Sequence, residues 1–242
     1  MTFQQTRKID YFQTATDGRI KLDALVRILQ NAALDHVHEA DRDAQVIIAA
    51  GYAWILNKVI IDISRYPVYG ETVTVNTWHR GIRGFKSYRE YEILAGGQRV
   101  ATAASSWLFL DLARRRVVKV PKETDELYGV VPALALGRDI ETWKPDKNLV
   151  PPESMEIITR RSDYDMLGHV NNAVYFDYLD TLIGNTLGDG FGVRTIAIQY
   201  NREISRDVKR IQAGLVKREN GACAYTIFDG SGVYACGDIV LA

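Results

Sequence analysis

Residues 155–187 read MEIITRRSDYDMLGHVNNAVYFDYLDTLIGNTL and combine a strand pattern, a polar loop and a helix pattern in that order. A strand is predicted at 155–161, and a helix is predicted from about Asn172 to Leu187. The helix carries one apolar stripe, with residues spaced by three and four: Val174, Tyr175, Tyr178, Leu179, Leu182 and Ile183. Four further strands are predicted beyond it, ending at Leu241. This part of the chain should therefore form one long helix packed on a β-sheet.

The first half of the chain has the same order of elements. A helix is predicted from Leu22, where apolar residues again recur at spacings of three and four up to Val37. Extended runs rich in β-branched and aromatic residues follow at 53–64, 71–79, 85–95 and 99–112. The short segments IDISR at 61–65 and REISR at 202–206 also resemble each other. We therefore expect an α+β protein with a tandem (double) hotdog fold, in which each half is a long helix wrapped by a bent antiparallel β-sheet.

The boundary between the halves is predicted from a change in composition. Glycine and proline residues interrupt any regular pattern between 121 and 152, ending in the pair Pro151-Pro152. We expect an N-terminal hotdog unit at 1–135, a linker at 136–152 and a C-terminal hotdog unit at 153–242.

Composition limits the classes of partner. The 242 residues include 30 Lys plus Arg and 30 Asp plus Glu, so no global field draws the chain to nucleic acid or to an anionic membrane. No apolar run approaches the ~18 residues that span a bilayer, and the first residues carry no export signal. Two cysteines, Cys223 and Cys236, suggest neither a disulfide framework nor a metal site. We expect a cytoplasmic protein without nucleic-acid or membrane partners.

The loop before the second helix holds the side chains best suited to chemistry. Asp165, His169 and Asn171 lie together there, and Gly168 permits a backbone conformation closed to other residues. Asn171 or Asn172 is a natural N-cap, and the positive end of the helix dipole can stabilise a carbonyl oxygen as it becomes an oxyanion. The alternative is that Asp165 and His169 are ordinary polar residues of a loop.

The pattern Asp-x-x-x-His-Val-Asn-Asn-x-x-Tyr, from Asp165 to Tyr175, resembles the active-site segment of acyl-acyl carrier protein thioesterases. Segments of the first half are also similar to that family: LQNAA at 29–33, RYP at 65–67, REY at 89–91, SW at 106–107 and RR at 115–116. The resemblance covers nearly the whole chain. It implies a double hotdog hydrolase that cuts the fatty-acyl thioester of acyl carrier protein and releases free fatty acid. In such a protein the N-terminal hotdog unit (1–135) would shape the acyl pocket, and the C-terminal hotdog unit (153–242) would be the catalytic half.

The resemblance also implies a site made by Asp165, His169 and Glu203, with Asn171 beside them. Water would attack the thioester, with Glu203 or Asp165 as general base and His169 positioning the substrate or stabilising charge. Neither a metal nor a cofactor is expected, because a thiolate is a good leaving group. The chain departs from the family at Leu167, where an asparagine is common, and at Ile204, where plant members have a cysteine.

The implied partner is acyl carrier protein bearing an acyl-phosphopantetheine arm. The basic residues Arg80, Arg83, Lys86 and Arg89, with 114–116, are candidates to bind it, although they are also what a solvated strand face would carry. His36 and His38 are expected on a solvated helix face. The protein is expected to be a monomer or a homodimer.

Two other functions stay open. The first is hydrolysis of acyl-CoA, which the segment 168–172 favours because single hotdog acyl-CoA thioesterases have similar segments. The second is binding of acyl thioesters without cleavage, which the residues at Leu167 and Ile204 suggest.

Overall fold

The computed structural model describes residues 1–39, 44–188, 192–219 and 221–242. The chain forms two compact units, Met1–Thr142 and Trp143–Ala242, and each is described here by itself. Residues 136–142, which the composition assigned to a linker, thus lie within the first unit. Among the described residues, no helix has the length and apolar character needed to cross a membrane.

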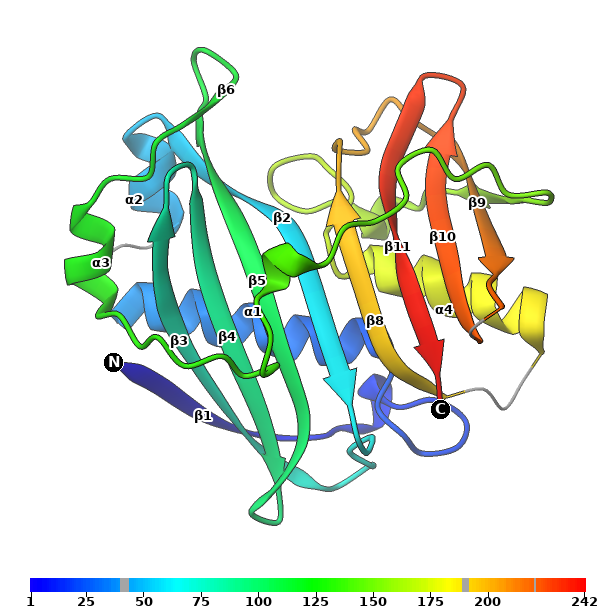
Figure 1. The fold of residues 1–242 in the computed structure, drawn as a ribbon, viewed down its shortest axis with the longest axis horizontal. Coiled ribbons are helices and arrows are strands. Elements are labelled where there is room, and N and C mark those ends of the chain that lie inside the picture. Colours follow the sequence, from blue (N-terminus) through cyan, green and yellow to red (C-terminus); the bar gives the residue numbers. More distant parts are fainter. Residues whose placement is uncertain (40–43, 189–191, 220) are drawn as a thin grey trace. The chain divides into compact units, whose positions relative to one another are not determined.

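The first unit is an antiparallel sheet with a long helix on one face (Figure 1). Its strands pair in the order β1-β3-β4-β5-β2, with β6 on the end of β5. The four predicted extended runs correspond to β2–β5, although β3 continues past His79 through a register shift. The elements are β1 (Thr2–Lys8), α1 (Leu22–Glu39), α2 (Ala44–Ala49), β2 (Tyr52–Ile63), β3 (Thr72–Arg83), β4 (Lys86–Ala95), β5 (Gln98–Asp111), β6 (Arg116–Val118) and α3 (Glu123–Tyr128).

The predicted apolar stripe of α1 is buried, and the burial extends further than expected. Leu25, Val26 and Leu29 are buried as the pattern indicates. His36 is also buried, at 5% exposure, so its expected solvated position is wrong. The reason is that Arg89 on β4 donates to His36 Nδ1 at 2.8 Å, and the Phe3 ring stacks on the imidazole at 5.6 Å. Burial and the adjacent Arg89 charge lower the pKa of His36 to about 4.

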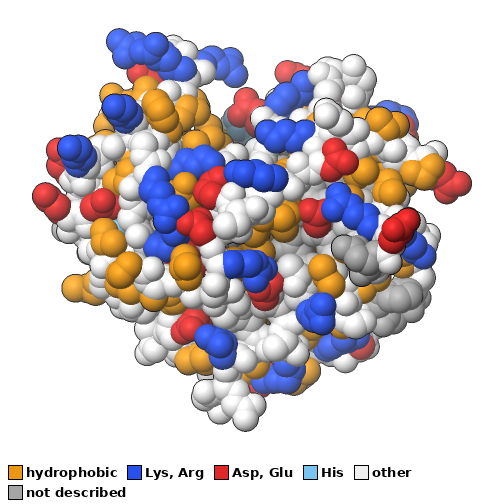
Figure 2. Space-filling model, viewed as in Figure 1, with side chains coloured by type: hydrophobic (Ala, Val, Ile, Leu, Met, Phe, Trp, Pro, Cys, Tyr) orange, Lys and Arg blue, Asp and Glu red, His pale blue; other side chains and the backbone are white. Residues whose placement is uncertain are grey.

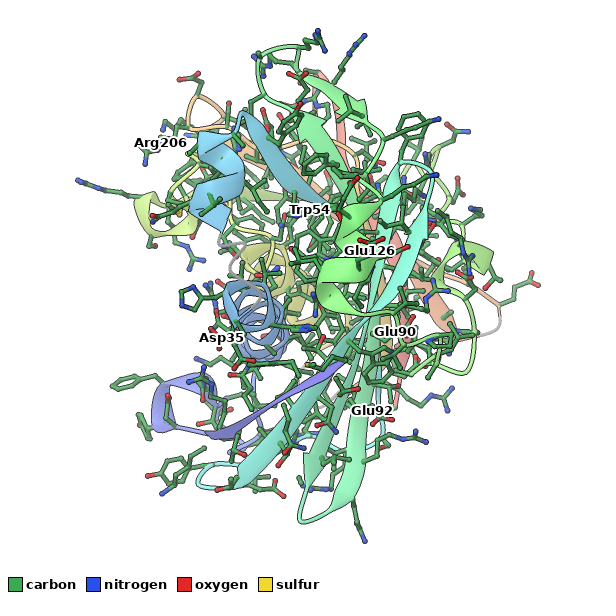
Figure 3. All side chains as sticks on the ribbon, turned by 90° about the vertical axis from the view of Figure 1, so that its left-hand side faces the viewer. Asp35, Trp54, Glu90, Glu92, Glu126 and Arg206 are labelled. Carbon is green, nitrogen blue, oxygen red and sulfur yellow. The ribbon has the colours of Figure 1, made fainter. Side chains whose placement is uncertain are left out.

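The opposite face of this sheet is covered by the segment 130–142, which we call the strap. Asp35 marks the helix α1 in Figure 3, and Glu90 and Glu92 lie on the side of the sheet away from this helix. The strap is fixed there by hydrogen bonds from Trp78 Nε1 to the Ala133 carbonyl at 3.0 Å and from the Ala135 N–H to Glu90 at 3.0 Å. The strap is therefore packed structure and not a free connection.

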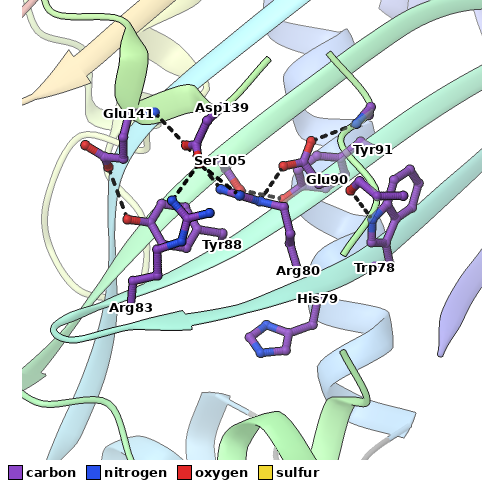
Figure 4. A network of polar contacts seen from close by, with 12 residues as sticks. Trp78, His79, Arg80, Arg83, Tyr88, Glu90, Tyr91, Ser105, Asp139 and Glu141 are labelled. Atoms are coloured by element: carbon purple, nitrogen blue, oxygen red, sulfur yellow. Dashed lines mark hydrogen bonds and ion pairs between the residues drawn. The ribbon is translucent and has the colours of Figure 1, made fainter. Parts of the chain in front are cut away.

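Two acidic residues hold the far end of the strap to the sheet (Figure 4). Asp139 accepts from Arg83 at 2.6 Å and from Arg80 at 3.2 Å. Glu141 accepts from Lys86 at 2.7 Å and from Lys58 at 3.3 Å. Burial alone would raise the pKa of each carboxyl group, but the hydrogen bonds and positive charges lower the pKa of both to about 2.

From the ion pairs of the strap we expect the stability of the first unit to fall in acid. Because the folded-state pKa of Glu141 is depressed from 4.5 to about 2, its contribution is fully present above pH 4.5 and is lost as the pH falls towards 2. We expect Glu141→Gln to reduce the free energy of unfolding by roughly 2–3 kcal/mol at pH 7 and by much less at pH 2. Urea unfolding of both proteins at a series of pH values measures this difference. A difference that does not shrink with decreasing pH would contradict the assignment.

The second unit repeats the arrangement with a shorter sheet. Its strands pair antiparallel in the order β8-β11-β10-β9-β7. The helix begins two residues later than predicted, and the first strand ends three residues early because 161–163 form a 3₁₀ turn. The elements are β7 (Met155–Ile158), α4 (Val174–Leu187), β8 (Val193–Tyr200), β9 (Arg210–Lys217), β10 (Ala222–Asp229) and β11 (Gly232–Leu241). Two units of a long helix and an antiparallel sheet confirm the predicted tandem hotdog fold.

In the two units the segments that precede the long helices α1 and α4 have the same backbone structure. Each has a 3₁₀ turn, a tight turn at a glycine of positive φ, and two isolated bridges. The glycines are Gly18 (φ 77) and Gly168 (φ 81). The second bridge joins Arg19 to Val68 in one unit and His169 to Ser205 in the other. Arg19 therefore occupies in the first unit the backbone position that His169 occupies in the second.

Candidate active site

A buried carboxylate fixes both ends of the loop that precedes α4. Asp163 is 2% exposed and accepts hydrogen bonds from the Arg160 N–H at 2.7 Å and from the Tyr178 hydroxyl at 2.6 Å. The other carboxylate oxygen of Asp163 accepts from Arg160 Nε at 2.9 Å. The backbone carbonyl of Asp163 accepts from the Asn171 N–H at 2.8 Å. Asp163 thus joins the end of β7, the loop and the helix.

Asp165 shapes the tight turn inside this loop. Its backbone N–H donates to the His169 carbonyl at 2.9 Å, and its carbonyl accepts from the Gly168 N–H at 3.0 Å. Its Oδ1 accepts from the N–H groups of Leu167 at 2.9 Å and His169 at 3.4 Å. Gly168 supplies the positive φ that closes the turn. The carboxylate therefore sets the position of the His169 backbone.

His169 contacts Glu203 across two segments of chain. The bridge between His169 and Ser205, and the hydrogen bond from the Val170 N–H to the Ile204 carbonyl at 2.9 Å, bring the segments together. His169 Nδ1 lies 3.3 Å from Glu203 Oε2, and the two side chains are 34% and 48% exposed. When Nδ1 carries the proton, its N–H donates a hydrogen bond to the Glu203 carboxylate, and Nε2 keeps a lone pair. The pair is thus accessible to solvent and suited to accept a proton.

Asn171 forms the connection into α4. Its Oδ1 accepts from the Ala173 N–H at 2.9 Å, and its carbonyl accepts from the Val174 N–H at 2.9 Å. The Tyr200 hydroxyl holds the next residue by donating to the Asn172 carbonyl at 2.9 Å. The N-cap of α4 is Ala173, which makes no side-chain capping hydrogen bond. Asn171 lies three residues before Val174, so its side chain closes the turn ahead of the helix and does not fill the predicted N-cap position. The dipole of α4 points its positive end towards this loop.

The four predicted basic residues do not form a free cationic surface. Arg89 is buried and donates to His36 and Thr77, and Arg80 is buried against Glu90 and Asp139. Arg83 and Lys86 pair with the strap acids (Figure 4). Arg80 and Arg89 cannot contact a carrier protein directly, because they lie beneath other residues. The sequence did not indicate this, since strand alternation does not tell which face a strap will cover.

Sequence reasoning missed the residues that support the loop, and it also missed the equivalent loop of the first unit. Asp163 and Tyr178 lie 15 positions apart, and nothing in that separation predicts their hydrogen bond. The equivalence of the loops could have been found by aligning Asp-Gly-Arg-Ile at 17–20 with Leu-Gly-His-Val at 167–170. In the first unit Arg19 pairs with Asp17 and lies over the Tyr66 ring at 5.6 Å. That loop has no histidine, and so cannot reproduce the His169–Glu203 pair.

In the described ranges, no three His, Cys, Asp or Glu side chains gather as metal ligands would. The fold and the loop define a tandem hotdog protein with a polar site at the start of its second long helix.

Comparison with known proteins assigns the family. The family model for the acyl-acyl carrier protein (ACP) thioesterase N-terminal domain matches residues 1–128, and that for the C-terminal domain matches residues 147–237. The chain belongs to the acyl-ACP thioesterase family. This confirms the family that the pattern at 165–175 indicated.

Individual relatives are distant in sequence. A chloroplastic palmitoyl-acyl carrier protein thioesterase of Arabidopsis thaliana is 23% identical over 219 residues, covering 86% of this chain and 53% of that protein. A chloroplastic dodecanoyl-[acyl-carrier-protein] hydrolase of Cinnamomum camphora is 24% identical over 227 residues, covering 86% and 57%. The chain spans about half the length of the curated relatives it matches.

Solved structures share the fold along the whole chain. An acyl-ACP thioesterase from Bacteroides thetaiotaomicron has a TM-score of 0.87 at 17% identity, covering 100% of this chain and 98% of that one. The 12:0-ACP thioesterase from Umbellularia californica also has a TM-score of 0.87, at 18% identity, covering 100% and 97%. At these identities the likeness establishes the tandem hotdog fold alone.

Proposed function

We propose that this protein hydrolyses the thioester of acyl-ACP, releasing a free fatty acid and the carrier thiol. The observation that carries the proposal is the contact of His169 Nδ1 with Glu203 Oε2 at the start of α4, in a chain of the acyl-ACP thioesterase family. Both side chains are partly exposed, as groups that meet a substrate must be.

The geometry favours His169 and Glu203 as the proton-transferring pair. Glu203 holds the Nδ1 proton, and Nε2 takes a proton from the attacking water. The carbonyl oxygen gains negative charge, which the positive end of the α4 dipole stabilises. The C–S bond then breaks, and the proton on Nε2 passes to the leaving thiolate. No metal or cofactor takes part in this scheme.

Asp165 is proposed to position His169 and not to act as the base. Its Oδ1 already accepts from two backbone N–H groups of the turn. Asp165→Asn keeps an oxygen at this place but removes the charge, so we expect kcat to fall by about tenfold or more while KM changes little. A kcat equal to that of the wild type would remove Asp165 from the site.

The departures from the family pattern fit this scheme. Ile204 is buried, so its position could not present a nucleophile to solvent. Leu167 is exposed and offers only its backbone N–H, to Asp165. The scheme therefore depends on His169 and Glu203 for all of its proton transfer.

Steady-state kinetics with matched acyl chains tests the proposal. We expect kcat/KM, measured by thiol release, to be higher for acyl-ACP than for acyl-CoA over a panel of chain lengths. Carrier-bound substrate no better than acyl-CoA would make the protein an acyl-CoA thioesterase, the alternative that residues 168–172 favour. Tight binding of acyl thioesters without thiol release would make it a non-catalytic binding protein.

We also propose a cytoplasmic location and a monomer or homodimer. The location is supported by Cys223 and Cys236, which are both free and buried, as in a reducing compartment. The names of the plant relatives of this protein, by contrast, give a chloroplastic location for those proteins. Fractionation of the native source and light scattering of the purified protein test the two statements.

A further inference from the structure

The end of the β5–β6 hairpin in the first unit concentrates positive charge. Residues 112–119 read LARRRVVK, with four cations and no acid. The cationic side chains are all exposed, and we call them the arginine tip: Arg114, Arg115, Arg116 and Lys119. Figure 2 shows Lys and Arg side chains gathered at the upper end of this hairpin, which Figure 1 marks by β6.

Part of this charge has no acidic partner within the described part of the chain. Arg114 reaches Asp111 at 3.4 Å, yet its side chain remains 66% exposed. Arg116 and Lys119 have no acidic partner among the described residues. Arg83 and Lys86, by contrast, are held by the strap acids. The arginine tip therefore presents a dense group of exposed cations, whereas Arg83 and Lys86 are engaged by the strap.

The turn of the tip holds Arg115 in a backbone conformation that is uncommon for a residue other than glycine. Arg115 has φ 50, and it is the one described residue other than glycine with a positive φ. Glycine or asparagine adopts this conformation more readily than a long side chain does. The hairpin thus keeps a charged side chain where the local backbone favours a small one, as strained positions at functional sites do.

Exposed apolar side chains lie beside the cations. Leu112 and Val117 are exposed on the hairpin itself. The Val120 N–H donates to the Gly84 carbonyl at 3.4 Å, which joins the hairpin to the β3–β4 turn and its exposed Phe85. A surface with apolar residues among cations suits a folded acidic partner better than it suits a nucleic-acid backbone, which offers charge alone.

We propose that the arginine tip, with Leu112, Val117 and Phe85, is the docking surface for the acidic carrier protein that bears the acyl chain. The inference rests on the proposed function. Opposite charges at the edge of an interface accelerate the encounter of the two proteins, and their attraction weakens as salt is added. The tip would therefore act mainly on KM, and kcat would depend on the second unit.

The test compares two double charge reversals of equal size. Arg114→Glu with Arg116→Glu alters the tip. Lys8→Glu with Arg99→Glu is the control, because Arg99 lies at the other end of β5, a strand of 14 residues that spans ~45 Å. Each protein is assayed with acyl-ACP and with the neutral acyl-N-acetylcysteamine thioester, and its binding to holo-ACP is measured directly by calorimetry.

We expect the tip variant to raise KM for acyl-ACP, and Kd for holo-ACP, by about tenfold or more at low salt. Its kcat/KM for the small thioester should be unchanged, and the control variant should resemble the wild type. Unchanged binding in the tip variant, or equal losses in both variants, would overturn the proposal. So would weakened binding to anionic lipid vesicles with binding to holo-ACP intact.

The binding measurement separates this inference from the proposed function. If the wild type cleaved neither substrate but bound holo-ACP through the tip, the hydrolytic proposal would fail and the docking surface would stand. If it cleaved the small thioester but did not bind holo-ACP, the docking surface would fail.

Discussion

His169→Ala is expected to lower kcat/KM for acyl thioester hydrolysis by about 10²- to 10⁴-fold, the range that general acid–base groups contribute. The reason is that the His169 side chain is 34% exposed and its Nδ1 lies 3.3 Å from Glu203 Oε2, which leaves Nε2 as the proposed base. Because the side chain is partly exposed and donates nothing to the core, the free energy of unfolding should change by less than about 0.5 kcal/mol. Thiol-release kinetics and urea unfolding measure the two quantities.

The first unit offers a matched control for this substitution. Arg19 occupies the same bridge position in the equivalent loop, so Arg19→Ala alters a side chain on the same backbone but outside the proposed site. It should retain wild-type hydrolysis. Equal losses in both variants would mean that the loops act on folding and not on chemistry, and full activity of His169→Ala would refute its role.

Asp163→Ala is expected to be the most destabilising of the substitutions proposed for the second unit. Truncation leaves the buried Tyr178 hydroxyl and the Arg160 N–H without their acceptor. A buried donor left without its acceptor costs about 1–3 kcal/mol, and two donors lose theirs here. Hydrolysis should also fall, because the Asp163 carboxylate fixes the start of the loop to Arg160 and to Tyr178 of α4.

Asp177→Ala is the appropriate control, because Asp177 binds the same arginine, Arg160, from an exposed position on α4. An exposed ion pair contributes about 1 kcal/mol or less, so this variant should unfold almost as the wild type does. Asp163→Asn, which keeps an oxygen for Tyr178, should be intermediate. Similar free energies of unfolding for Asp163→Ala and Asp177→Ala would contradict the importance of the buried network.

The elements that the sequence predicted are those with a local cause. The stripe of α1 and the strands β2–β5 follow from spacing and residue type, and the loop before α4 follows from Gly168 and Asn171. The strap could not be predicted in this way, because Asp139 and Glu141 pair with cations 55–83 positions earlier in the chain. His36 was misplaced for the same reason, since its burial depends on Arg89 from another element.

In the candidate site, too, only the residues that a local pattern brings together could be predicted from the sequence. Asp165, His169 and Asn171 lie within one short segment, so a local pattern brings them together. Glu203 joins them through a bridge between distant segments, and only its resemblance to a family position suggested it. Asp163 and Tyr178 have neither a local pattern nor a motif, so their contact emerges only from the folded chain.

The matching turns at Gly18 and Gly168 have the form that duplication of a single ancestral unit would leave. Both copies kept the backbone conformation, because a bridge and a positive φ are needed to lead the chain into the helix. The side chain at the bridge position was under no such constraint, and it became Arg19 in one copy and His169 in the other. Two copies of one scaffold could thus diverge into separate tasks without either having to refold.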